Sequence, residues 1–164
     1  MFLFARWSYL AEGLGHFGDV PGQVDMYLDD GTIAEDNFPE FMARLDSTLS
    51  RITPRHNVII IQTFPKYDVS IPIAMIRNLR FGAQLPLQTR EVYAAREART
   101  NRAVAALAAT YGAQVLAPQD LLCANGTCAI EQDGVPLYFD QVHLSPKGND
   151  VLRDLLFEEL EVSR

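Results

Sequence analysis

The sequence predicts an α/β protein, a three-layer sandwich in which helices cover a short parallel sheet. The clearest strand covers residues 57–63, where the four β-branched residues Val58–Ile61 follow one another without polar alternation. Such a run is typical of a parallel strand that is covered on both faces. Shorter apolar segments at residues 2–6 and 113–117 predict two further strands, and helical segments separate all three. Because strands that alternate with helices form parallel sheets, we expect the three strands to be adjacent in chain order.

The helices are predicted from apolar residues spaced three and four apart. Gly112 is expected to cap the longest helix, and Ser145-Pro146 to open the last one. Asn125-Gly126 and Asp133-Gly134 are turn signals that predict a β-hairpin or a pair of short turns. The expected elements are helices over residues 35–52, 73–80, 87–111 and 146–161, a hairpin within residues 122–139, and a long glycine-rich loop over residues 11–34.

The longest predicted helix is rich in alanine and arginine. Its inward face is expected to consist of Val92, Ala95, Val104, Leu107, Ala108 and Tyr111. Three arginines and two glutamates of the same helix predict a solvated face with ion pairs. These charged residues are Arg96, Arg99, Arg102, Glu91 and Glu97.

Composition places the chain among globular proteins and predicts a single domain over residues 1–164. Of the 164 residues, 48% are hydrophobic and 21% are charged. The net charge of −7 argues against a nucleic-acid binder, because phosphate contacts need clustered Lys and Arg. No aliphatic run approaches the roughly 20 residues that span a bilayer. The start, MFLFARW, lacks the basic leader of a signal peptide and opens directly on a core strand, which suggests a cut domain.

Asp140 and His143 are the clearest candidates for catalytic residues. A carboxylate three residues before a histidine on a tight turn can accept a hydrogen bond from the imidazole Nδ1–H. That bond selects the tautomer and leaves Nε2 free to take a proton from a nucleophile. The spacing alone also fits a surface turn in which Asp140 accepts hydrogen bonds from backbone N–H groups. The surrounding sequence is needed to choose between these interpretations.

The segment Gly134–Leu152, GVPLYFDQVHLSPKGNDVL, resembles the last motif block of SGNH hydrolases. It is most similar to the SGNH domain at the C-terminus of membrane acyltransferases of the acyltransferase-3 family. The residues that match in order and spacing are Cys123, Cys128, Pro136, Leu137, Tyr138, Asp140, His143, Leu144, Ser145 and Gly148. The segments MFLFARWSY and NVIIIQTFP resemble upstream strands of the same domain, so the resemblance extends over most of the chain.

This resemblance implies the C-terminal part of a serine esterase or O-acyltransferase domain, which passes an acyl group to a carbohydrate hydroxyl or to water. His143 would be the general base and then the general acid, and Asp140 would orient it. The resemblance further implies O-acylation of cell-surface glycans and a membrane acyltransferase domain on the N-terminal side. It places the protein on the periplasmic or extracellular face of a bacterial membrane. No cofactor, metal site or nucleic-acid partner is expected.

The nucleophilic serine of this family stands in a Gly-Asp-Ser motif after the first strand, and this chain has no such motif. Gly18-Asp19-Val20 comes closest but lacks the hydroxyl group. Ser8 is the serine nearest to a predicted strand end, in a setting that matches a different block. We therefore expect the nucleophile and the first two strands of a five-stranded domain to be missing, and the isolated chain to be inactive. The strand at Phe2–Ala5 would then be an exposed sheet edge.

Arg6 and Trp7 stand where most SGNH hydrolases have Gly-x-Asn-Asp, whose asparagine helps to bind the oxyanion. They are candidates to line the substrate pocket; the alternative is a strand-end ion pair for Arg6 and a core position for Trp7. Cys123 and Cys128 flank Asn125-Gly126, whose tight reversal favours a disulfide and hence an oxidising compartment. Two free thiols or half of a metal site are the alternatives, and a lone C-x₄-C pair is weak evidence for zinc.

Two other functions fit parts of the sequence. A degenerate SGNH-like module would bind glycan or protein without catalysis. A flavodoxin-like signalling or binding domain fits the fold class, but the first strand lacks the clustered acidic residues of a receiver domain. The letters of a dinucleotide-binding motif occur at Gly13–Gly18, where no convincing helix follows.

Overall fold

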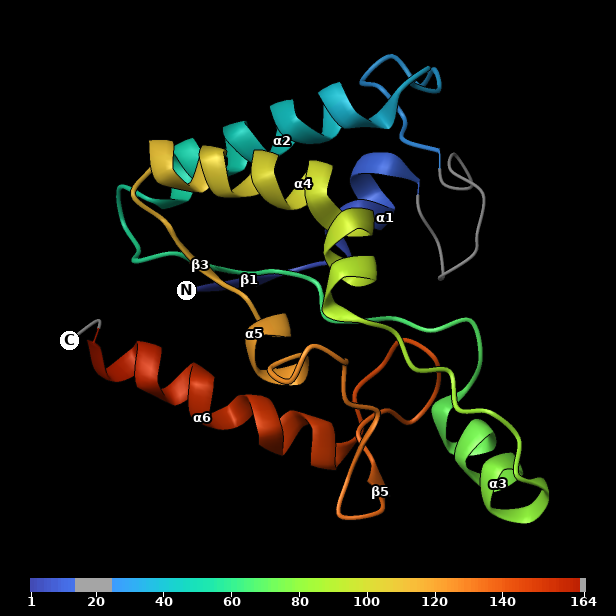
Figure 1. Ribbon diagram of the computed structural model, residues 1–164. Helices are drawn as coiled ribbons and strands as arrows, with labels where there is room; N and C mark the ends of the chain where they lie inside the picture. Colours follow the sequence, from blue (N-terminus) through green and yellow to red (C-terminus); the bar gives the residue numbers. More distant parts are fainter. Residues whose placement is uncertain (14–24, 163–164) are drawn as a thin grey trace. The chain divides into compact units, whose positions relative to one another are not determined.

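Three short parallel strands form one sheet in the order β1-β2-β3 (Figure 1). They are β1 (Phe2–Phe4), β2 (Ile59–Ile61) and β3 (Gln114–Leu116). The three predicted strands, their parallel direction and their order are confirmed. The structure is a computed structural model that describes residues 1–13 and 25–162. Two sequence motifs fall outside these residues. They are Gly18-Asp19-Val20 and the dinucleotide-binding letters at Gly13–Gly18, of which only Gly13 is described.

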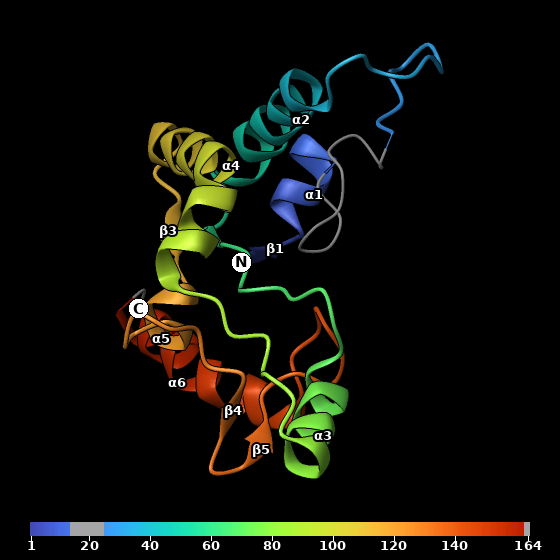
Figure 2. The same ribbon diagram turned by 45° about the vertical axis from the view of Figure 1, so that its right-hand side comes forward.

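The described residues group into two compact units, each with its own hydrophobic core. The first unit comprises Met1–Thr63 and Ala94–Ala117 and contains the parallel sheet. The second comprises Phe64–Tyr93 and Pro118–Arg164. Both units therefore draw on two separate stretches of sequence. Helix α4 (Arg90–Thr110) begins in the second unit and continues into the first (Figure 2).

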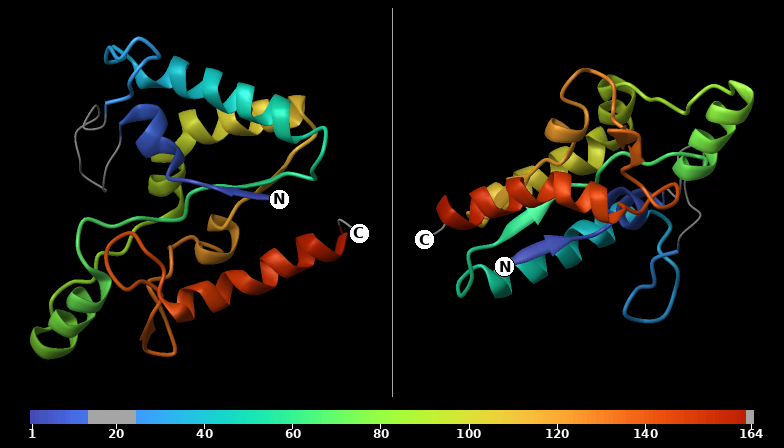
Figure 3. Two further views of the ribbon diagram at one scale, coloured as in Figure 1. Left: turned by 180° about the vertical axis from the view of Figure 1, so that it is seen from behind. Right: turned by 90° about the horizontal axis from the view of Figure 1, so that it is seen from below.

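In the first unit, α1 (Trp7–Glu12), α2 (Asn37–Ile52) and the greater part of α4 pack on the sheet (Figure 3). The N-terminus of α2 is capped by Asp36, whose side chain accepts a hydrogen bond from the backbone N–H of Phe38 at 2.9 Å. The apolar face of α2 follows the predicted spacing. The core of this unit consists of Trp7, Ala11, Phe41, Leu45, Leu49, Val58, Ile60, Val104 and Ala108.

β2 is the central strand and is buried on both faces. Val58, Ile59 and Ile60 are consecutive, and each is no more than 2% exposed. Because successive strand side chains point to opposite faces, the sheet is covered on both sides at this strand, as its unbroken apolar run predicts. Within the described residues β1 pairs only with β2, so it is an edge strand, and its Phe2 and Phe4 are partly exposed.

Helix α1 is not predicted by the sequence, because six residues are too few to show a helical period. Its Trp7 and Ala11, four residues apart, are both buried. Gly13 ends the helix in the left-handed conformation at φ 64°. The predicted strand over residues 2–6 is consequently shorter, and the predicted loop over residues 11–34 begins two residues late.

The inward face of α4 differs from the predicted one. Val92 and Ala95 are exposed, whereas Val104 and Ala108 are buried as expected. The buried positions of the helix are Tyr93, Glu97, Thr100, Val104 and Ala108. The apolar pattern did not reveal this face because two of its members are polar. A polar side chain is buried only where the rest of the fold supplies its hydrogen bonds.

The second unit contains α3 (Ile71–Phe81), α5 (Gln119–Leu122), α6 (Pro146–Val162) and the antiparallel pair β4 (Glu131–Gln132) and β5 (Val135–Pro136). The predicted hairpin is confirmed and turns at Asp133-Gly134, where both residues have positive φ. β5 contacts both α3 and α6. The core of this unit consists of Tyr67, Ile71, Tyr93, Leu122, Cys123, Cys128, Ile130, Leu137, Tyr138 and Leu152.

Candidate active site

A short loop between β5 and α6 carries Asp140 and His143. An antiparallel bridge between Tyr138 and Leu144 closes this loop at its base. Inside the loop, the backbone N–H of Phe139 donates a hydrogen bond to the carbonyl oxygen of His143 at 3.0 Å. The backbone between the two candidate side chains is therefore fixed by its own hydrogen bonds.

The segment that precedes α3 and the first residue of α3 anchor the loop through backbone hydrogen bonds. The backbone N–H of Tyr67 donates to the carbonyl of Gln141 at 2.9 Å, and that of Ile71 donates to the carbonyl of Asp140 at 3.2 Å. Tyr67 and Ile71 belong to the buried core of the second unit. The loop is thus anchored to that core through its backbone carbonyl groups.

Ser145 is the expected N-cap of α6. Its Oγ donates to the carbonyl of Pro136 at 2.7 Å and accepts from the backbone N–H of Gly148 at 3.2 Å. A Cβ atom at Gly148 would lie 2.1 Å from the carbonyl oxygen of Leu137. The first turn of α6 therefore packs so closely on the chain before the loop that only glycine fits at this position.

The predicted hydrogen bond between Asp140 and His143 is present. Asp140 Oδ2 lies 2.7 Å from His143 Nδ1. Asp140 Oδ1 accepts from the backbone N–H groups of Val142 and His143, each at 2.7 Å. The carboxylate therefore has both of the roles that the sequence left as alternatives. One oxygen stabilises the turn and the other holds the imidazole.

The far side of the His143 ring is open. Its side chain is 63% exposed, against 27% for Asp140. The ring of Phe139 stacks on the imidazole, with centroids 5.6 Å apart and planes inclined by 25°. Within the described residues, no group hydrogen-bonds to Nε2 of His143. With Nδ1–H donated to Asp140, this nitrogen is the acceptor of the ring and can take a proton from an incoming hydroxyl group.

The environment of Asp140 favours its ionised form. Partial burial works to raise the pKa of Asp140, but the hydrogen bonds from the His143 ring and from the backbone N–H groups of Val142 and His143 outweigh it. The pKa of Asp140 therefore lies below its ordinary value. An ionised carboxylate is the form that can hold an imidazole and stabilise the imidazolium that proton transfer creates.

This lowered pKa predicts that Asp140 stops stabilising the fold in acid. A carboxyl group whose pKa is lower in the folded state stabilises that state above its unfolded pKa, about 3.9 for Asp, and the effect is lost as the pH falls through the folded-state pKa. We expect Asp140→Asn to lower the free energy of unfolding at about pH 7 and to have a much smaller effect at about pH 2.5. Urea unfolding of both proteins measures this; equal effects at the two pH values would contradict it.

Comparison with protein families identifies the kind of domain. The family model described as "SGNH domain (fused to AT3 domains)" matches residues 1–158. The chain belongs to this SGNH family. A comparison with curated proteins found no match.

A solved structure shares the fold of this SGNH domain. It is the periplasmic domain of the lipopolysaccharide acetyltransferase of Salmonella ser. Paratyphi A, with a TM-score of 0.54 and 16% sequence identity. The likeness covers 74% of this chain and 49% of that chain. The chain thus spans about half the length of that structure, and at this identity the comparison shows the α/β fold alone.

The sequence left two positions open for Trp7, the lining of a substrate pocket or the core. In this SGNH domain Trp7 is in the core. It is buried, its Nε1 donates to the carbonyl of Ile61 at 2.6 Å, and its ring packs edge-to-face on Phe41. Trp7 therefore joins the start of α1 to the carboxyl end of β2. The guanidinium of Arg6 lies over the ring of Tyr9, 4.1 Å from its centroid. Both residues belong to the first unit, whereas Asp140 and His143 belong to the second.

Four of the five serines that the structure describes are buried, lie on α2 or cap a helix. Ser8 is fully buried in the first turn of α1, so a substrate cannot meet it there. Ser47 and Ser50 are on α2, where Ser50 Oγ donates to the carbonyl of Ser47. Ser145 caps α6. Among residues 1–13 and 25–162, none of these hydroxyl groups bonds to His143.

The sequence predicts Glu97 on a solvated face, and that expectation is wrong because its carboxylate is buried. It is 1% exposed, and Thr63 Oγ1 donates to its Oε2 at 3.4 Å. Arg96 Nε lies 3.7 Å from its Oε1. One turn further along α4, Thr100 donates to Glu12 of α1. Thr63 follows β2, so this polar cluster lies beyond the carboxyl end of the central strand, the edge where α/β proteins usually bind ligands.

Cys123 and Cys128 form a disulfide, which was one of the three arrangements that the sequence left open. Both cysteines are fully buried in the core of the second unit. The backbone N–H of Cys128 donates to the carbonyl of Gln88 at 2.9 Å. The bridge therefore fixes a turn that packs against the start of α4.

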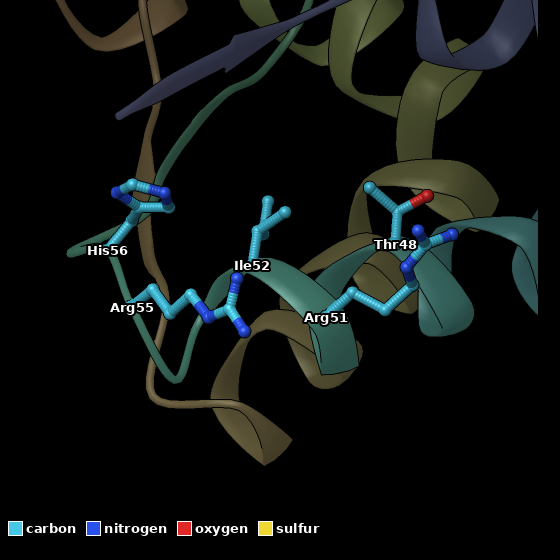
Figure 4. A pocket seen from close by; sticks show the side chains of 5 residues that line it. All are labelled: Thr48, Arg51, Ile52, Arg55 and His56. Atoms are coloured by element: carbon cyan, nitrogen blue, oxygen red, sulfur yellow. The ribbon is translucent and has the colours of Figure 1, made fainter.

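A hollow of about 570 Å³ lies at the C-terminal end of α2 in the first unit (Figure 4). It is lined by Thr48, Arg51, Ile52, Arg55 and His56 and is therefore basic. Within the described residues, no group of His, Cys, Asp and Glu side chains is arranged to hold a metal ion. Across residues 1–13 and 25–162, no helix has the length and apolar character needed to cross a membrane.

Proposed function

We propose that this SGNH domain is part of a serine-dependent O-acyltransferase or esterase in which His143 is the general base and Asp140 orients it. The observation that carries the proposal is the 2.7 Å hydrogen bond between Asp140 Oδ2 and His143 Nδ1. It holds the imidazole in the tautomer whose Nε2 accepts a proton. Membership of a family whose domains are fused to AT3 domains supports the assignment.

In this proposal the nucleophile is a serine outside these 164 residues. His143 Nε2 takes the proton of the serine hydroxyl as its oxygen attacks the carbonyl of the acyl donor, and Asp140 stabilises the imidazolium. The imidazolium then protonates the leaving group, and an ester of the serine remains. In the second half, the acceptor hydroxyl attacks this ester. His143 takes the acceptor's proton and returns it to the serine oxygen.

The proposed acceptor is a hydroxyl group of a cell-surface glycan, with a membrane acyltransferase domain as the partner that provides acyl groups. Two observations support this placement. The solved structure of similar fold is the periplasmic domain of a lipopolysaccharide acetyltransferase. The Cys123–Cys128 disulfide suits an oxidising compartment, as the periplasmic or extracellular face of a bacterial membrane is.

The isolated chain is expected to hydrolyse an activated acetyl ester no faster than its His143→Ala variant, because a positioned base without its nucleophile performs no covalent catalysis. The measurement is release of 4-nitrophenol from 4-nitrophenyl acetate by both purified proteins. A His56→Ala variant is the control for hydrolysis by any exposed imidazole, because His56 is exposed and belongs to the first unit. Turnover that His143→Ala abolishes and His56→Ala leaves intact would show a nucleophile within the chain.

A further inference from the structure

Four of the exposed large apolar side chains of the second unit are on α3. Leu79 and Phe81 are 83% and 78% exposed, and Ile73 and Ile76 are each about half exposed. Only one side of the helix faces the core, through residues such as Ile71, which is fully buried. Exposed large apolar residues at this density mark an interaction surface.

The same helix is basic in an acidic chain. Residues 69–90 contain three arginines and no acidic residue, whereas the whole chain has a net charge of −7. Arg77 and Arg80 are exposed and form no ion pair with any residue that the structure describes. With about 100° per residue along a helix, these two arginines share the outward face with Ile73 and Ile76.

A hollow of about 260 Å³ runs alongside this face. Val69, Ile73 and Pro86 contribute apolar walls, and Arg77 stands at its rim together with Asp68. The hollow therefore combines apolar walls with one cation, Arg77, and one anion, Asp68.

We propose that α3 is an interfacial helix that binds the second unit to an anionic lipid surface. Charge complementarity decides the occupant. Helices that lie in the headgroup region place apolar side chains among the acyl chains, while arginines reach the phosphates through their long apolar stems. The proposal does not depend on the catalytic role of His143, because no residue of α3 belongs to the Asp140–His143 loop.

The test measures binding of the 164-residue chain to sedimented vesicles of phosphatidylcholine with about one third phosphatidylglycerol, and to vesicles of phosphatidylcholine alone. We expect binding to the anionic vesicles that weakens at high salt. Each arginine near such a surface is worth about 1 kcal/mol, or about fivefold. Arg77→Glu/Arg80→Glu should therefore weaken binding at least about 25-fold. The matched control, Arg51→Glu/Arg55→Glu in the basic hollow of the first unit, changes net charge equally and should leave binding unchanged (Figure 4).

A second pair of variants tests the apolar part. Leu79→Ser/Phe81→Ser should weaken binding about tenfold or more, because both side chains would leave the acyl region. The control Leu121→Ser/Phe157→Ser removes exposed apolar groups from α5 and α6 and should have no effect. All four replaced residues are exposed, and circular dichroism checks that each variant is folded.

Three results would overturn the proposal. The first is no binding of the wild type to the anionic vesicles. The second is an equal loss in a test pair and its control, which would mean that overall charge or hydrophobicity acts without α3. The third is self-association of the wild type that the α3 variants abolish while vesicle binding persists, which would assign this surface to a second copy of the chain.

Discussion

Replacing His143 by alanine is expected to slow the proposed acyl transfer about 1000-fold, measured with this domain joined to the proposed membrane acyltransferase domain. The proposed serine would then have no group to take its proton as it attacks. Asp140→Asn is expected to cost about 100-fold or more, because an amide at this position no longer selects the Nδ1–H tautomer or stabilises the imidazolium. Initial rates of acyl transfer at saturating donor, with the amount of folded protein matched, measure both losses.

His56→Ala is the matched control for this measurement. His56 is exposed at the turn between α2 and β2 and belongs to the first unit. Its replacement should change the rate by less than about twofold. If His143→Ala kept more than about a tenth of the wild-type rate, His143 would not be the general base. A degenerate SGNH module that binds glycan or protein would then describe the domain better.

Replacing Glu97 by alanine is expected to lower the free energy of unfolding by about 3 kcal/mol. The carboxylate is 1% exposed and pairs with Thr63 and Arg96. Its removal leaves a poorly hydrated guanidinium without its counter-charge and a cavity between α4 and the end of β2. Glu97→Gln keeps the shape and one acceptor oxygen, so its loss should be smaller, about 1 kcal/mol.

Urea unfolding of the disulfide-bonded chain measures these differences. Glu91→Ala is the control, because Glu91 is an exposed carboxylate near the start of the same helix. Its replacement should cost less than about 1 kcal/mol. If Glu97→Ala and Glu91→Ala had equal effects, the buried cluster around Glu97 would contribute no net stability.

The sheet could be predicted because its signal is local. Four consecutive β-branched residues define β2, and the helical segments between the strands imply parallel pairing. Helix α1 was missed because it has fewer than two turns. The face of α4 was misplaced for another reason. Glu97 and Thr100 face inward because α1 and the end of β2 supply their hydrogen-bonding partners. A hydropathy pattern does not show partners that are distant in the sequence.

The candidate site was predictable in part for the same reason. Asp140 and His143 are three residues apart, and Ser145 caps the helix that follows, so their hydrogen bond follows from local sequence. The bonds that anchor the loop were not predictable, because Tyr67 and Ile71 are about 70 residues away in the chain. The stacking of Phe139 on His143 depends on side-chain orientation within the loop, which spacing alone does not determine.

The tautomer of His143 tests the central claim most directly, because the proposed chemistry requires a free Nε2 with the proton on Nδ1. Long-range ¹H–¹⁵N correlation spectra of the isolated chain at about pH 9, where histidine side chains are neutral, report which ring nitrogen carries the proton. We expect Nδ1 of His143 to be protonated in the wild type and this preference to be lost in Asp140→Asn. A proton on Nε2 in the wild type, or identical spectra for His143 in the two proteins, would contradict the account.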